Sequence, residues 1–247
     1  NTLQERDKAA NTINLTLSAL KGVMKACFNL GLIDADQLMR LNDIKRVRGK
    51  RLPSGRSLSK QEIKKLYRAC TQDKSAAGRR DHAILAIMLA TGIRRSEVIA
   101  IKLEDYNKRT GQLNIQSGKG NKQRTAYLNT ESRRVIKLWL SIKEEQVKKA
   151  NTKKCKKIFN PITKTGSIQG RMLSSHSLYE IIKNRAEQAQ IDACRPHDLR
   201  RTFVTQLLES GVDINTTRQL VGHSDIQTTA RYDMRDEKSQ KKAVRGM

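Results

Sequence analysis

The sequence predicts an α+β fold, mainly α-helical with one small antiparallel β-sheet. Three observations carry this prediction. Apolar residues recur at helical spacing over residues 11–33, AILAIMLA (83–90) reads as a helix that can seed a core, and residues 113–128 alternate around a glycine-rich turn. The chain has 247 residues, which suffices for one large domain or two modest ones.

The N-terminal part reads as a small helical domain over residues 1–43. A helix over 11–33 closes at Gly31, and a second short helix follows over 34–41. So few residues cannot bury a large core alone. Because the chain begins with Asn1 rather than Met, we expect a fragment or a processed chain.

A basic linker is expected over residues 44–57. The stretch IKRVRGKRLPSGRS mixes Lys and Arg with Gly, Pro and Ser, which is typical of linkers. Its charge indicates that it lies along a phosphate backbone. The expected DNA contacts in this linker are Arg46, Arg48, Lys50 and Arg51.

The second domain is expected over residues 58–247, with a polar tail at its end. It opens at Ser59, and a glutamate three residues later completes the pattern of a capping box. The hairpin at 113–128 supplies the sheet, and almost everything else reads as helix. Near the end of the domain, Gly222 terminates one helix and Ser224 can cap the next.

Charge and cysteine usage narrow the functional classes. Fifty Lys and Arg against twenty-four Asp and Glu leave a net charge of +26, so a nucleic acid is the natural partner. The basic residues are not gathered on one amphipathic helix, and no apolar run approaches the ~20 residues that span a bilayer, which argues against a membrane partner. The four cysteines are scattered without a CxxC pair, which argues against a zinc site or a disulfide framework.

Two motifs place arginines on rigid supports. Gly92 breaks a buried helix in ATGIRRSEV and leaves Arg94 at the break, with a new short helix beginning near Ser96 or Glu97. In HDLRRTF, a histidine and an arginine spaced i, i+3 share one helix face. The expected apolar stripe beside them consists of Leu199, Phe203 and Leu207. Two guanidinium groups suit a phosphoryl group, since each planar fork matches two oxygens.

A phenol completes the candidate set, because Tyr232 follows His223 by nine residues. Taken singly, these residues have ordinary interpretations: surface charge, a structural histidine, a docking aromatic, and a solvated hairpin tip for GKGNK (118–122). Their order and spacing together carry the functional hypothesis.

The series Arg, Lys, His-x-x-Arg, His, Tyr, in the contexts TGIRRSE, GKGNK, HDLRRT, VGH and ARY, closely resembles the tyrosine recombinase (phage integrase) family. The resemblance covers about residues 58–235, and each catalytic position of the family motif is filled. It implies the tyrosine-recombinase catalytic fold. Residues 1–43 look like the later part of the family's core-binding domain, which we expect to be incomplete here.

The resemblance implies a role for each position. Tyr232 is the expected nucleophile, which attacks a DNA phosphodiester and leaves a 3′-phosphotyrosyl link and a free 5′-hydroxyl. Arg94 and Arg200 are expected to bind the non-bridging oxygens and stabilise the transition state. Lys119, on the hairpin, is expected to protonate the departing 5′-oxygen.

The remaining positions have supporting roles. His197 is expected to act as acid or base or to hydrogen-bond the phosphate, and His223 to donate a further hydrogen bond. Glu97 matches a carboxylate common in the family, which orients a neighbouring cation or serves only as a cap or salt bridge. The basic neighbours expected to contact the DNA backbone or to be structural are Arg95, Lys122 and Arg201.

The function implied is site-specific recombination or DNA integration by a mobile genetic element, without metal, cofactor or ATP. The expected partners are double-stranded DNA and three further copies in a homo-tetramer, with a monomer or dimer when free, and accessory proteins are unknown. A type IB topoisomerase uses a very similar set of residues and is the first alternative. A non-catalytic helix-turn-helix DNA-binding protein is the second.

The cellular setting follows from the same reasoning. We expect a cytoplasmic, nucleoid-associated protein of bacterial or phage origin. The tail after Tyr232 is either a frayed terminus or a segment that docks on a neighbouring subunit.

Overall fold

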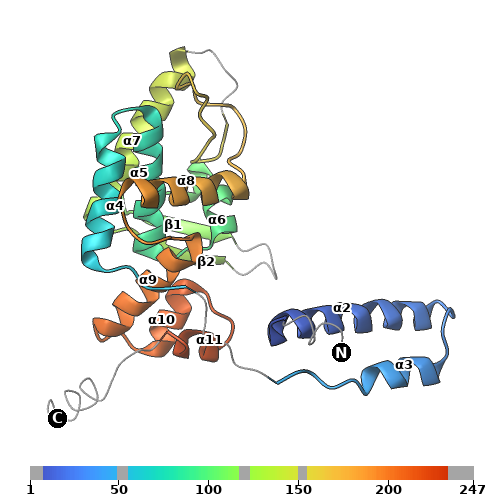
Figure 1. Cartoon of the computed structure of the whole chain (residues 1–247). Coiled ribbons are helices and arrows are strands. Elements are labelled where there is room, and N and C mark those ends of the chain that lie inside the picture. Colours follow the sequence, from blue (N-terminus) through green and yellow to red (C-terminus); the bar gives the residue numbers. More distant parts are fainter. Residues whose placement is uncertain (1–7, 49–54, 117–122, 150–154, 233–247) are drawn as a thin grey trace, which may run out of the picture. The chain divides into compact units, whose positions relative to one another are not determined.

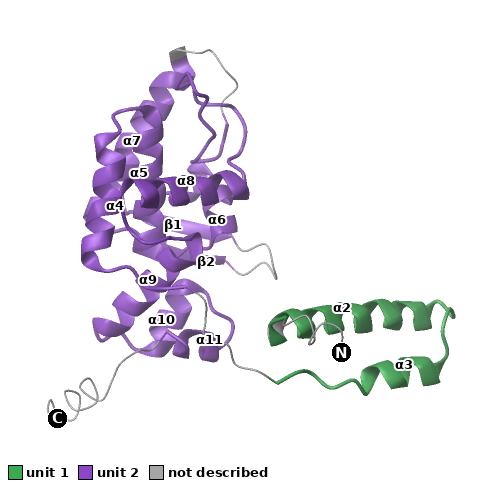
Figure 2. Cartoon of the chain, in the orientation of Figure 1, with its two compact units in different colours: residues 1–54 green, residues 55–247 purple. Residues whose placement is uncertain are grey.

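The computed structural model describes residues 8–48, 55–116, 123–149 and 155–232. The chain forms two compact units, Asn1–Ser54 and Gly55–Met247 (Figure 2). Helices dominate and the described strands form one two-stranded sheet, so the predicted fold class is confirmed. Within the described ranges, no helix has the length and apolar character needed to cross a bilayer.

Unit 1 consists of α2 (Ala10–Asn29), α3 (Ala35–Asn42) and the segment that follows α3. The side chain of Asp34 accepts a hydrogen bond from the third residue of α3, so a capping box fixes the start of this helix. After α3 the chain returns to α2, where the Asn14 amide bonds both backbone groups of Val47 at 3.0 and 2.9 Å. No described side chain of unit 1 is buried, so hydrogen bonds rather than packing in a closed apolar core hold the segment after α3 against α2.

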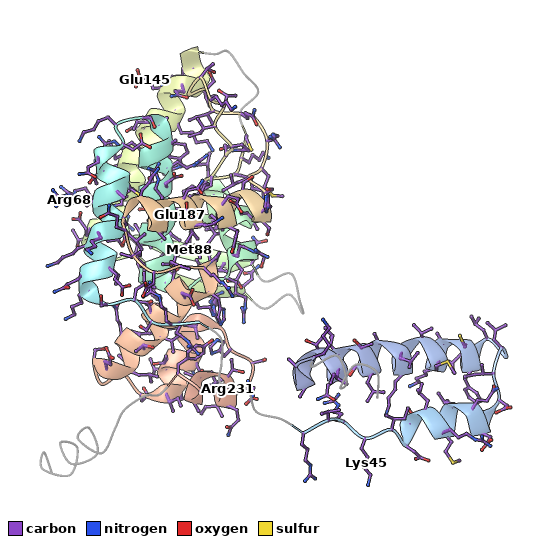
Figure 3. The ribbon with its side chains drawn as sticks, in the orientation of Figure 1. Lys45, Arg68, Met88, Glu145, Glu187 and Arg231 are labelled. Atoms are coloured by element: carbon purple, nitrogen blue, oxygen red, sulfur yellow. The ribbon has the colours of Figure 1, made fainter. Side chains whose placement is uncertain are left out.

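Unit 2 is built around one central helix, α5 (Ala76–Thr91). Three of the helices packed around it are α4 (Lys60–Gln72), α7 (Thr130–Lys149) and α8 (Ser175–Gln188). Apolar residues occupy every face of α5 from Ala83 to Leu89, because it is packed against α4, α7, α8 and α9. Figure 3 shows Met88 inside this packing, fully buried, and Arg68 pointing outward from α4.

The sheet is the antiparallel pair β1 (Gln112–Gln116) and β2 (Gln123–Tyr127), which confirms the predicted hairpin. Its inward side chains are Leu113, Ile115 and Ala126, in the alternation expected for a strand with one buried face. A short helix, α6 (Arg95–Ala100), and a 3₁₀ turn, η1 (Leu103–Asp105), join α5 to the sheet.

Three helices end the described chain: α9 (Pro196–Glu209), α10 (Ile214–Val221) and α11 (Ile226–Ala230). Figure 1 shows them at one end of unit 2. A second apolar cluster joins them, made of Val204, Leu208, Val221 and Tyr232. The predicted apolar stripe is confirmed at Leu199, which is buried, and at Phe203, which is partly buried and packs against the second cluster. Leu207 is only half-buried, and Val204 and Leu208 supply the rest of the buried face of α9. One local prediction was wrong. The cap of α11 is Asp225 rather than Ser224, because the Asp225 carboxylate accepts from the Gln227 N–H at 2.9 Å.

The first residues of unit 2 are bonded directly to α9. The Arg56 N–H donates to the Asp198 carboxylate at 3.1 Å, and the Leu58 N–H donates to the Thr202 hydroxyl at 2.9 Å. Gly55 has a φ of +110°, and a Cβ there would lie 2.5 Å from the Asp198 carboxylate. Glycine is therefore required for this close approach.

Candidate active site

The N-terminal end of α9 positions two of the predicted residues. Arg195 is the N-cap and Pro196 opens the helix, while the Asp198 carboxylate accepts the Arg195 N–H at 2.8 Å. This acidic group in the first turn complements the helix dipole, so the neighbouring basic residues are tolerated there. His197 and Arg200 then lie one turn apart, and Arg200 is only 3% exposed.

The C-terminal end of α10 holds three arginines. The last carbonyls of a helix have no partner within it and form the negative end of its dipole, so they attract cations. Three successive carbonyls are each bound by a different guanidinium: Leu220 O accepts from Arg124 Nε at 3.2 Å, Val221 O from Arg200 Nη2 at 2.9 Å, and Gly222 O from Arg94 Nη2 at 2.8 Å.

Arg200 also reaches the C-terminal end of α5, where its Nη1 donates to Gly92 O at 2.6 Å. It thus joins the ends of two helices while using only part of its five N–H groups. Burial, followed by the charges of Arg94 and Arg124, lowers the pKa of Arg200 to about 10. The guanidinium still carries its proton at neutral pH.

Glu97 lies between two of these arginines and is 6% exposed. Its Oε1 accepts from Arg94 Nη1 at 2.9 Å, and its Oε2 accepts from Arg124 Nη2 at 3.0 Å and from the Arg94 N–H at 2.9 Å. Burial alone raises the pKa of the Glu97 carboxyl, but the hydrogen bond and charge of Arg124, with the bonds from Arg94, outweigh burial and lower it. Arg94 caps α6, which begins at Arg95, so the expected start near Ser96 or Glu97 was displaced by one to two residues.

Tyr232 is 7% exposed and lies beside both histidines. Its hydroxyl is 2.9 Å from His197 Nε2. The His223 ring is nearly parallel to the phenol ring, at 13° with centroids 6.0 Å apart. The Arg201 guanidinium carbon lies 5.2 Å from the centroid of the same ring, in a cation–π contact.

Both histidines are held in the neutral form. Burial, then the charge of Arg200, lowers the pKa of His197. Burial, then the charges of Arg200 and Arg94, lowers the pKa of His223 to about 4. His223 Nδ1 is 2.9 Å from the hydroxyl of Thr229, which is fully buried.

Several of these side chains line a cavity of about 570 Å³. Its lining residues are Ile93, Arg94, Arg95, Ser96, Ser175, Tyr179, Arg195, Pro196, His197, Arg200, His223, Thr228 and Tyr232. A larger cavity of about 770 Å³ lies between α7 and the turn before β1 and shares none of these residues. Size alone would therefore select a different cavity, whereas the smaller one contains the Tyr232 hydroxyl within hydrogen-bonding distance of His197.

Most of the predicted catalytic set is in this one pocket. The residues brought together are Arg94, His197, Arg200, His223 and Tyr232. The sixth, Lys119, lies outside the described residues, as do the expected DNA contacts Lys50, Arg51 and Lys122. Arg46 and Arg48 are exposed in unit 1. Arg201 contacts the Tyr232 ring, and its Nη1 also donates a hydrogen bond to the Gly55 carbonyl.

Sequence reasoning missed three contributors. Arg124 of β2 binds Glu97 and α10, Thr229 of α11 binds His223, and Tyr179 of α8 lines the cavity. The signal for Arg124 was present, because it precedes the inward-facing Ala126 by two residues and therefore shares its face of the strand. Thr229 and Tyr179 lack such a signal, since only tertiary packing brings α8 and α11 to the pocket.

The chain is similar to known proteins. The model of the phage integrase family matches residues 56–239. The tyrosine recombinase XerD of Pseudomonas aeruginosa is 32% identical over 231 residues, covering 93% of this chain and 72% of the relative. XerA of Pyrococcus furiosus is 31% identical over 242 residues, covering 98% of this chain and 76% of the relative.

Solved structures agree at the level of the fold. A crystal structure of XerA recombinase superposes with a TM-score of 0.63 at 20% identity and covers 99% of this chain and 79% of its own. The Tn1549 transposon integrase gives a TM-score of 0.68 at 16% identity, covering 100% and 82%. These relatives are recombinases, so the topoisomerase alternative is not favoured. The chain belongs to the phage integrase family and is a tyrosine recombinase, a DNA strand-transferring enzyme.

Proposed function

We propose that this pocket cleaves and rejoins DNA in site-specific recombination, with Tyr232 as the nucleophile. One observation carries the proposal: the Tyr232 hydroxyl is 2.9 Å from His197 Nε2, in a cavity that also holds Arg94 and Arg200. A nucleophile, a base and two phosphate-binding cations are the parts that transesterification of a phosphodiester needs.

The tyrosine oxygen attacks the scissile phosphorus. A bond forms between this oxygen and phosphorus, and the bond from phosphorus to the 5′-oxygen breaks, which leaves a 3′-phosphotyrosyl link. The neutral His197 ring, whose pKa is lowered, can accept the phenol proton through Nε2. The 5′-oxygen leaves with a proton, for which Lys119 is the proposed donor on the resemblance alone. Reversal by a 5′-hydroxyl from another duplex rejoins the strand, so no external energy source is needed.

The phosphate is proposed to bind between Arg94 and Arg200. Both guanidiniums are fixed by the carbonyls of α10 and α5 before DNA arrives, and each retains N–H groups for phosphate oxygens. Such preorganised donors stabilise the developing charge without reorganising in the reaction. Because Arg200 is buried, the lower local dielectric also strengthens its interaction with a phosphate.

The remaining groups set orientation. The Thr229 hydroxyl, if it donates to His223 Nδ1, leaves the ring proton on Nε2, where it is available to a phosphate oxygen. Glu97 is proposed to orient Arg94 rather than to react, since each of its oxygens is bound by a cation.

Double-stranded DNA and further copies of the chain are the proposed partners. XerH recombinase has been solved bound to its difH substrate, and lambda integrase as a dimer on a core site and a tetramer on a Holliday junction. We propose the same for this chain: a homo-tetramer on two duplexes, and a monomer or dimer when free. The exposed Arg46 and Arg48, with Lys50, Arg51 and Lys122, are proposed to contact the DNA backbone. A chromosome or mobile element in a bacterial or phage-infected cell is the proposed setting.

The test is a search for a covalent adduct. Wild-type protein and Tyr232→Phe are incubated with fragmented DNA from the source genome and denatured in detergent, and the DNA that remains attached to protein is sequenced. We expect attached DNA with a shared junction sequence from the wild type and none from Tyr232→Phe. Equal attachment in both would rule out Tyr232 as the nucleophile, and binding without attachment in either would favour the non-catalytic DNA-binding alternative.

A further inference from the structure

Arg124 connects the β-hairpin to the pocket, although it does not line the cavity. Its side chain is 13% exposed and projects from β2. It donates from Nη2 to Glu97 at 3.0 Å and from Nε to Leu220 O at 3.2 Å. Its Cδ lies so close to Gly222 that a Cβ there would be 3.0 Å away. Arg124 is therefore packed against the same turn of α10 that holds Arg94 and Arg200.

The carboxylate of Glu97 is shared between two cations. Arg94 and Arg124 bind opposite oxygens, so neither guanidinium takes the whole negative charge. Without Arg124, the buried carboxylate would pair with Arg94 alone and reduce the positive charge that Arg94 offers to a phosphate. The Leu220 carbonyl would also lose its partner at the end of α10.

Arg124 further lies on β2, the strand that follows residues 117–122, which include Lys119 and Lys122. Its partner in the β-ladder is Ile115, a buried residue, so Arg124 lies on the same inward face of the hairpin as Ile115. The same side chain thus anchors the hairpin stem, Glu97 and α10.

We propose that Arg124 is a positioning residue for strand cleavage: it holds Glu97 and the end of α10 so that Arg94 and Arg200 face one phosphate. The inference rests on the proposed function of this pocket. It assigns Arg124 no contact with DNA, and its effect passes through residues that it binds.

The first test separates cleavage from binding. The single-turnover rate of adduct formation and the dissociation constant for the same DNA are measured for wild type, Arg124→Gln and the control Arg134→Gln. Arg134 is an exposed arginine of α7 that pairs with Glu131, so the control removes the same charge far from the pocket lining. We expect Arg124→Gln to cleave about 10- to 100-fold more slowly, because a small misplacement of catalytic groups costs that much. Its DNA affinity should change no more than that of the control.

Conservative replacement and coupling refine the result. Arg124→Lys keeps the charge, but one ammonium cannot reproduce the fork that binds Glu97 and Leu220, so we expect only partial recovery of the rate. In Arg124→Gln combined with Glu97→Gln, the rate should fall by less than the product of the two single effects, since both act through one contact.

If Arg124→Gln does not unfold cooperatively, the cleavage rate of Arg124→Lys is compared with that of wild type instead. Wild-type rates in both Arg124 variants would overturn the proposal, as would independent effects in the double variant.

A second test of the proposed role of Arg124 does not require DNA cleavage. Burial lowers the pKa of His223 most, and the charges of Arg200, Arg94 and, more weakly, Arg124 lower it further. Nuclear magnetic resonance of the His223 ring in protein without DNA should therefore show a higher titration midpoint in Arg124→Gln and an unchanged one in Arg134→Gln. An unmoved midpoint contradicts the proposed network. Absence of adduct from the wild type instead contradicts the proposed function, so the two failures can be told apart.

Discussion

At the scale of single residues, the pocket is organised by backbone carbonyls rather than by carboxylates. Arg94, Arg124 and Arg200 each donate to a carbonyl at the end of α10, and Arg200 also binds the end of α5. Glu97 is the buried acid that joins Arg94 to Arg124. The site thus concentrates positive charge before a phosphate arrives. The same field keeps His223 neutral, because burial and the charges of Arg200 and Arg94 disfavour a further cation.

The neutral state of His223 predicts a dependence of stability on pH. Its pKa falls from 6.5 to about 4 in the folded chain, so the unfolded state binds more protons between these values. The free energy of unfolding should therefore decrease as the pH falls through this window, by on the order of 1–3 kcal/mol from this residue. Urea unfolding from neutral pH down to about 4 measures the decrease. His223→Gln should flatten the curve, whereas His176→Gln, which removes an exposed imidazole of α8, should leave it as in wild type. Parallel curves for all three proteins would contradict the assignment.

The sequence identified the side chains that meet in the pocket better than the side chains that support them. Arg94, His197, Arg200, His223 and Tyr232 were identifiable because their order and local contexts match a family motif, and such chemistry restricts residue type. Arg124 and Thr229 act by bonding other side chains, and only the folded distances reveal which ones. The interpretation of Arg201 as a DNA contact remains a prediction, and its contacts with Gly55 and the Tyr232 ring give it a structural role as well.

At the scale of elements, the turn between α5 and α6 aligns the pocket. Gly92 ends α5 in the left-handed conformation, with φ +58°, and presents its carbonyl to Arg200. A Cβ at this position would lie 2.5 Å from Phe203 Cδ1 on α9 and 3.2 Å from Val221. The turn thus combines a backbone requirement with close packing of three helices.

Replacement of Gly92 should therefore lower the free energy of unfolding by more than backbone strain alone would. For Gly92→Ala we expect a loss of about 2–4 kcal/mol in the free energy of unfolding, from left-handed strain and overpacking together. Gly211→Ala is the matched control, because Gly211 also has positive φ but no atom near its missing Cβ. That control should lose only about 1 kcal/mol. Denaturant titration measures the free energy of unfolding of both variants. Equal decreases in the two variants would mean that Phe203 moves aside without cost.

Helix boundaries were predictable where side chains cap the backbone locally. Ser59 with Glu62 was identified as a capping box, and Gly92 and Gly222 as helix ends, since these signals depend only on nearby residues. The start of α6 was nevertheless displaced, because the local pair Arg94 and Glu97 begins this helix at Arg95. The fuller burial of Val204 compared with Phe203 depends instead on a tertiary contact, the packing of α9 against α10.

At the scale of the whole molecule, the net charge of +26 dominates encounters with DNA. Part of this charge lies on the segment after α3. Val47 of this segment is bound to Asn14 of α2, and the flanking Arg46 and Arg48 are exposed. Two exposed cations that flank an anchored residue suit neighbouring phosphates.

The salt dependence of DNA binding tests this arrangement. Each phosphate contact contributes about 0.9 to the slope of log affinity against log salt concentration. Replacing Arg46 and Arg48 together by Gln should therefore lower the slope by about two and weaken binding equally on related and unrelated sequences. The control replaces Lys65 and Arg68, two exposed cations of α4, and removes the same net charge. Titrations at several salt concentrations compare the two proteins. If the slopes fall equally, overall charge rather than the segment after α3 determines the electrostatic part of binding.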